Sequence, residues 1–108
     1  MSKKLRKFVF KTLPRTEMQA GVDDSINYQT LLGIQLGLAG ANGVTVAQIM
    51  ERMKLIELVK GAEDFVLLEE NAHAQITKDL KNERWSRVTT NLVQFVSDFE
   101  NAEVVDSE

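Results

Sequence analysis

The chain has 108 residues, of which 44% are apolar and 27% are charged, a composition ordinary for a single soluble domain with one modest core. No apolar run approaches the roughly 20 residues that a membrane-spanning helix needs. The basic N-terminal segment also lacks the apolar stretch of a signal peptide. The sequence contains no cysteine, which excludes disulfides, thiolate metal sites and thiol nucleophiles. We therefore expect a cytoplasmic protein without a membrane partner.

The net charge of −3 conceals an uneven distribution along the chain. Residues 1–15 hold no acid and six bases, namely Lys3, Lys4, Arg6, Lys7, Lys11 and Arg15. The last nine residues hold no base and four acids, namely Glu100, Glu103, Asp106 and Glu108. Oppositely charged ends of this kind either stay solvated or meet a partner. We expect one domain over residues 1–108, with mobile ends at residues 1–7 and 101–108.

The N-terminal half predicts one strand and one helix. Residues 4–13 alternate in the manner of a strand, which Pro14 ends because proline cannot donate to a ladder. A polar loop over residues 15–25 finishes with helix-capping side chains, and helical spacing predicts a helix over residues 26–39. Residues 34–38 also alternate, so a strand there stays open, although the length of the run favours the helix.

The C-terminal half predicts three helices around a second strand. A capped helix covers residues 45–62, and the short apolar run of residues 64–69 predicts a strand that pairs with the first. Further helices are predicted over residues 71–83 and from residue 89 or 90 onward. Together these elements predict a mainly helical α+β domain, with about four helices packed on a small two-stranded antiparallel sheet.

The predicted helix at residues 45–62 begins like a helix-turn-helix DNA-binding motif. However, Met50 stands where that motif has a small residue, and Lys54 stands where it has the turn glycine. The segment that would read DNA begins with the apolar and acidic run 55–58, although phosphate contacts need Lys or Arg. One uninterrupted helix is the better interpretation.

The same helix carries two apolar faces. One stripe is about 120° wide and predicts the side that faces the core; its members are Val46, Ile49, Met50, Met53 and Ile56. The opposite side carries Leu55, Leu58, Val59 and Ala62. Either the second strand and last helix of the same chain cover this second face, or a partner subunit buries it. These last four residues are therefore the candidate partner interface.

Metal binding and catalysis find little support. Glu70 and the only histidine, His73, have the i, i+3 spacing of di-iron bundles, which need two such motifs and two further glutamates. A dimer would have to supply the rest, whereas a solvated histidine near a helix N-terminus explains the same residues. Adjacent acids at residues 63–64 and 69–70 could serve acid–base catalysis but usually lie in water. No nucleophile triad, phosphate loop or dinucleotide fingerprint occurs. We expect no enzyme and no cofactor.

Nucleic-acid binding stays open in one form. The N-terminal bases interleave with Phe8 and Phe10, as in a basic strand that stacks nucleobases. We call this set the basic strip; it consists of Lys3, Lys4, Arg6, Lys7 and Lys11. The two phenylalanines are also the best core candidates of their strand, and the rest of the chain is acidic. Nucleic-acid binding is therefore possible but not favoured.

The layout of the chain resembles small proteins encoded by tailed bacteriophages. The segments that carry the resemblance are FVFKT at 8–12, INY at 26–28, TVxxIxxRM at 45–53, VLLEE at 66–70, RW at 84–85 and FVSD at 95–98. They cover most of the chain. The resemblance implies a phage origin and a non-catalytic role, in a virion, in its assembly or in contact with a host protein. It transfers no functional residue.

The leading hypothesis is a non-enzymatic, self-associating interaction module that serves as a phage virion or assembly component. It rests on the second apolar face of the 45–62 helix and on the oppositely charged ends. The expected partners are further copies of the chain and a phage or host protein, in the host cytoplasm or the virion. The alternative is a phage regulator that binds nucleic acid, or a host nucleic-acid-binding protein, through the basic strip.

Overall fold

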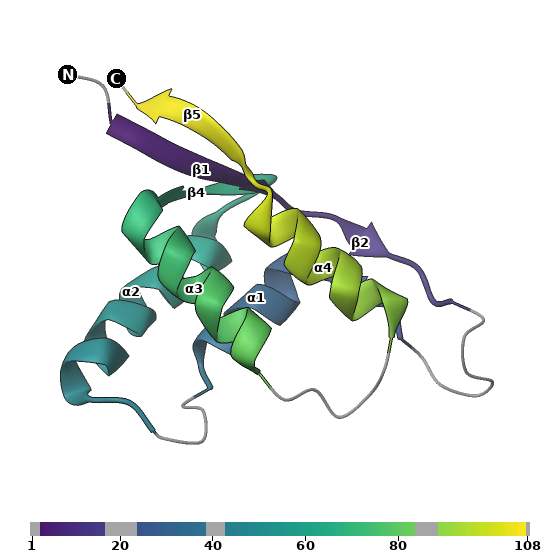
Figure 1. Cartoon of the computed structure of the whole chain (residues 1–108), viewed down its shortest axis with the longest axis horizontal. Helices are drawn as coiled ribbons and strands as arrows, with labels where there is room; N and C mark the ends of the chain where they lie inside the picture. Colours follow the sequence, from purple (N-terminus) through teal and green to yellow (C-terminus); the bar gives the residue numbers. More distant parts are fainter. Residues whose placement is uncertain (1–2, 17–23, 39–42, 84–88, 108) are drawn as a thin grey trace.

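The computed structural model describes residues 3–16, 24–38, 43–83 and 89–107. In chain order these ranges form β1 (Lys3–Val9), β2 (Thr12–Leu13), β3 (Ile26–Asn27), α1 (Tyr28–Leu36), α2 (Val46–Gly61), β4 (Phe65–Glu69), α3 (Glu70–Asn82), α4 (Thr90–Glu100) and β5 (Glu103–Ser107) (Figure 1). Of the helices in these ranges, none combines the length and apolar character that crossing a membrane requires.

The larger sheet has β1 at its centre, antiparallel to β4 on one side and to β5 on the other. Phe8 pairs with Val66 and Arg6 with Leu68. Alternate side chains point to opposite faces of a sheet, so Phe8, Val66 and Leu68 share the face that is buried under the helices. A separate two-stranded sheet joins β2 to β3.

The mainly helical α+β fold with four helices is confirmed within the described residues, and so is the antiparallel pairing of the first strand with residues 65–69. The expected two-stranded sheet is wrong, because β5 adds a third strand and β2–β3 form a second sheet. The strand predicted over residues 4–13 divides into β1 and β2. The helix predicted from residue 26 begins at Tyr28, after Ile26 and Asn27 have paired with β2.

The two charged ends lie against each other along the β1–β5 ladder. The mobility that the sequence suggests for residues 1–7 and 101–108 stays a prediction. Lys3 pairs with Ser107 and Lys7 with Glu103 along the β1–β5 ladder, and the side chains of Lys4 and Asp106 form an ion pair. Opposite charges on register partners favour this pairing. Residues 1, 2 and 108 lie outside the described ranges.

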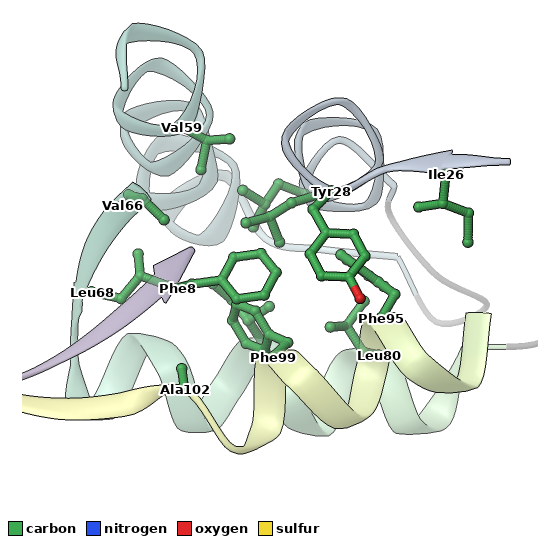
Figure 2. Packing of buried hydrophobic residues seen from close by; sticks show 13 residues of the cluster. Phe8, Ile26, Tyr28, Val59, Val66, Leu68, Leu80, Phe95, Phe99 and Ala102 are labelled. Carbon is green, nitrogen blue, oxygen red and sulfur yellow. The ribbon is translucent and has the colours of Figure 1, made fainter. Parts of the chain in front are cut away.

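Phe8 is the centre of the core (Figure 2). Its ring stacks on Tyr28 at a centroid distance of 5.5 Å and meets three phenylalanines edge-on, namely Phe10, Phe95 and Phe99. Such offset and edge-to-face pairs add to the burial of apolar area. One side chain of β1 therefore joins the sheet to α1 through Tyr28 and to α4 through the other two buried rings.

Three hydrogen bonds, one from Tyr28 and two from Asn91, fix α4 against the N-terminal half. The hydroxyl of buried Tyr28 donates to Asp98 Oδ2 at 2.6 Å. The amide Nδ2 of Asn91, also buried, donates to the carbonyls of Pro14 (3.0 Å) and Asp24 (2.8 Å). Burial, then the hydrogen bond to Asp98 and the negative charge of its carboxylate, raise the pKa of Tyr28 well above its usual value.

This raised pKa makes stability depend on alkaline pH. The unfolded chain can ionise Tyr28 above pH 10.0, the usual value, whereas the folded chain resists ionisation. The contribution of Tyr28 is therefore complete below that pH, and the free energy of unfolding falls above it by up to about 1.4 kcal/mol per pH unit. Tyr28→Phe should remove this slope and cost about 1 kcal/mol at pH 7.

Urea unfolding of both proteins between pH 7 and pH 11, followed by far-ultraviolet circular dichroism, measures the difference. Tyr28 is the only tyrosine, so the comparison isolates its titration from that of the lysines. Parallel stability curves for the two proteins above pH 10 would contradict the assignment.

Candidate protein-interaction surface

Helix α2 is fixed at both ends by side chains. At its start, Gln48 N–H donates to Thr45 Oγ1 at 3.2 Å, and Thr45 N–H donates to Gln48 Oε1 at 2.8 Å, which forms a capping box. At its end, the amide Nε2 of Gln29 donates to the carbonyls of Val59 and Ala62, both at 2.8 Å. These contacts satisfy backbone groups that a helix terminus leaves without partners. The helix is therefore a capped element rather than a frayed one.

Helix α2 packs against the core through one side of its C-terminal half. Val59 is completely buried, and Leu55, Ile56 and Ala62 pack against the core while partly exposed. In the middle of the helix, Arg52 donates to the carbonyl of Leu38, and its second terminal nitrogen lies 3.0 Å from Asp79 Oδ2 of α3. This arginine therefore links α2 both to the segment after α1 and to α3.

The opposite side of α2 forms what we call the α2 apolar face. Its four side chains are all exposed, by 72%, 43%, 59% and 57%: Val46, Ile49, Met50 and Met53. Spacings of three and four residues place them along one side of the helix. Ile34 of α1 and Leu38 just after it are exposed as well, and Arg52 holds Leu38 beside α2. A capped helix thus presents a continuous apolar stripe to solvent.

The sequence suggested which face of α2 packs against the core and which is exposed, and the structure shows the reverse assignment. The expectation that Val46, Ile49, Met50 and Met53 face the core is wrong, and only Ile56 of that stripe packs against it. In the candidate partner interface, the chain itself buries Val59 and covers Leu55 and Ala62, and only Leu58 is largely exposed. The physical reason is the packing of the last turns of α2 on α1, where Gln29 Nε2 donates to the carbonyls of Val59 and Ala62, so that the Val59 side of the helix turns inward.

The basic strip is mostly engaged within the chain. Lys4 pairs with Asp106, Arg6 Nε donates to Glu70 at 2.7 Å, and Lys11 Nζ lies 3.9 Å from Asp98. Lys7 Nζ lies 4.6 Å from the ring centroid of Phe65, a cation–π contact. Phe8 is buried and so cannot stack a nucleobase, and Lys3 enters the ladder opposite Ser107. These internal contacts compete with phosphate for the same charges.

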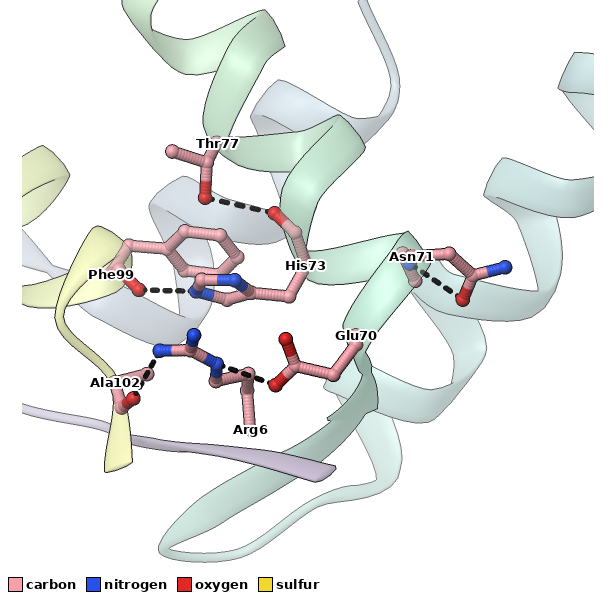
Figure 3. Close-up of polar contacts among 8 residues, drawn as sticks. Arg6, Glu70, Asn71, His73, Thr77, Phe99 and Ala102 are labelled. Carbon is pink, nitrogen blue, oxygen red and sulfur yellow. Dashed lines mark hydrogen bonds and ion pairs between the residues drawn. The ribbon is translucent and has the colours of Figure 1, made fainter. Parts of the chain in front are cut away.

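Glu70 and His73 diverge in their contacts (Figure 3). Glu70 accepts from Arg6, whose Nη1 also donates to the carbonyl of Ala102 at 3.0 Å. His73 is buried, contrary to the solvated position expected, and stacks on the Phe99 ring with Nε2 2.7 Å from the Phe99 carbonyl. Arg6, which Glu70 binds, and His73 thus hold the C-terminal end of α4. Among residues 3–16, 24–38, 43–83 and 89–107, no three acids or histidines gather to hold a metal ion.

The acid pairs considered for catalysis lie on the surface. Glu63, Asp64, Glu69 and Glu70 are all exposed. Glu70 is committed to Arg6. Both pairs are therefore in contact with solvent.

The exposure of the two α2 faces can be tested by paired valine truncations. Val59→Ala removes two methyl groups from a fully buried site and should lower the free energy of unfolding by about 2 kcal/mol. Val46→Ala, on the same helix, should change it by less than about 0.5 kcal/mol. Urea titrations of both variants at low protein concentration measure the difference. Equal losses, or a larger loss at Val46, would show that the faces are assigned the wrong way round.

Comparisons with protein-family models, with curated proteins and with solved structures found no match to this chain.

Proposed function

We propose that the chain is a non-enzymatic interaction module that self-associates through the α2 apolar face and serves as a phage virion or assembly component. The observation that carries this proposal is the exposed stripe of Val46, Ile49, Met50 and Met53 on a helix capped at both ends. Single exposed apolar side chains are common on soluble proteins, but a contiguous apolar patch marks an interaction site.

The geometry of the stripe suits a helical partner. Side chains at i, i+3, i+4 and i+7 are the anchors of helix-in-groove and helix–helix contacts. Met50 and Met53 contribute long, unbranched side chains that adapt to an irregular opposing surface. The capping box and the contacts of Gln29 and Arg52 hold the helix in place before any partner arrives. Little ordering of the backbone is therefore needed on association, which lowers the entropic cost.

A second copy of the chain is the simplest partner. In a twofold contact the same patch meets itself, and the four members of the stripe carry no charge that would repel its own copy. The phage resemblance of the sequence makes particle assembly the setting in which such a contact would act.

Light scattering over a range of protein concentrations, at low and high salt, tests the proposal. The native chain should associate, and Met50→Gln combined with Met53→Gln should weaken association at least about tenfold by removing two central apolar side chains. Glutamine keeps the helix propensity and adds no charge.

Two valines provide a matched control. Val46 in the α2 apolar face is 72% exposed, and Val93 on α4 is 70% exposed. Val46→Gln should weaken association, whereas Val93→Gln should leave it unchanged. A native chain that stays monomeric at both salt concentrations, or equal effects of the two valine variants, would overturn the proposal.

A further inference from the structure

Strand β5 is attached to the domain without burying its side chains. Among residues 103–106, whose side chains the structure describes, Val105 is half-buried and the other three are exposed. Buried Ala102, just before the strand, is the last core residue, and its carbonyl accepts from Arg6. The strand is held by its ladder to β1 and by ion pairing of Lys4 with Asp106. Releasing it therefore opens no part of the core.

Strand β4, on the other side of β1, is different. It places Val66 and Leu68 in the core, and it is continuous with α3 at one end and joined to α2 at the other. Strand β5 follows α4 after only two residues, Asn101 and Ala102. A short connection next to a weakly packed edge strand is the arrangement that favours exchange of an element between identical chains.

The edge of β1 that β5 covers carries lysines and therefore pairs best with an acidic strand. Lys4 faces Asp106 and Lys7 faces Glu103 in the register of the ladder. Like charges directly opposite each other destabilise a strand pair, whereas opposite charges stabilise it. A strand that replaces β5 must therefore offer main-chain hydrogen bonds together with acids at the corresponding positions. The β5 strand of another copy does both.

We propose that β5 exchanges between copies of this chain, so that β5 of each copy pairs with β1 of the other in a reciprocal dimer. The dimer keeps every contact of the β1–β5 ladder and changes the path of residues 101–102, at the expense of the contacts that Ala102 makes with Phe99 and Arg6. This contact lies on the sheet and is independent of the α2 apolar face. A strand-exchanged dimer would carry two α2 apolar faces, and contacts through both of them could extend a dimer into a larger assembly.

Charge complementation between two variants tests the exchange. One variant carries Lys4→Glu and Lys7→Glu, and the other carries Glu103→Lys and Asp106→Lys. In each variant alone, like charges face each other across the β1–β5 ladder. In an exchanged dimer of one copy of each variant, only unlike charges face each other. Native mass spectrometry of the incubated mixture should show a 1:1 heterodimer exceeding either homodimer at least about tenfold.

A shared pair of substitutions and a control chain make the result specific to strand exchange. Both variants also carry Met50→Gln and Met53→Gln, so that association through the α2 apolar face does not contribute and failure of that proposal is scored separately. The four charge changes combined in one chain restore unlike pairs internally, and this control should be as stable as the background chain. A mixture of folded variants that gives no heterodimer would overturn strand exchange.

Disulfide trapping separates exchange from simple attraction between oppositely charged variants, and it keeps the charged residues unchanged. The chain has no cysteine, so Leu5→Cys with Val105→Cys introduces a single pair across the β1–β5 ladder. Leu5→Cys with Glu69→Cys is the matched pair across the β1–β4 ladder. After oxidation, the first pair should give dimer-weight product that increases with protein concentration, and the second should give monomer-weight product. Monomer-weight product from both pairs at every concentration would show that β5 stays with its own chain.

Discussion

The packing of four aromatic rings around Phe8 is the interaction on which the other elements depend. Phe8 lies on the central strand, so its ring reaches the middle of the buried face of the sheet. Tyr28 approaches from α1, and Phe95 and Phe99 approach from α4. The ring distances fix how close each helix comes to β1. Helix α2 is positioned one step further out, through Val59 and through the side chain of Gln29, which belongs to α1.

Helix α4 makes polar contacts with segments that are distant from it in the sequence. Asn91 near its start binds the carbonyls of Pro14 and Asp24, Asp98 accepts from Tyr28, and the carbonyl of Phe99 meets His73. A typical hydrogen bond of this kind contributes only about 1 kcal/mol net, but a buried polar group without one costs more. The aromatic rings of α4 therefore supply most of its packing against the domain, and the polar side chains determine its orientation.

Local patterns of the sequence identified most helices and strands, but not which other elements each of them packs against or pairs with. The cap at Thr45 and the apolar run before Glu69 depend on neighbouring residues, so α2 and β4 could be predicted. Strand β5 could not, because Val104 and Val105 stand among acids and become a strand only beside the basic β1. The two faces of α2 were identified except for Ile56, which packs against the core, and Leu58, which is exposed. A helical projection cannot show which side turns inward, and the packing of α2 on α1 through Val59 and Gln29 decides it.

The position of β1 also has a consequence for the order of folding. Its partners lie far along the sequence, and the pair formed by Lys4 and Asp106 is separated by 102 positions. Loop closure over such distances is slow compared with the formation of the local helices. During synthesis on a ribosome, β1 emerges ahead of every other described element, yet one of its edges stays open until residues 103–107 have been added. The strand at the centre of the fold is thus the first to be made and the last to be completed.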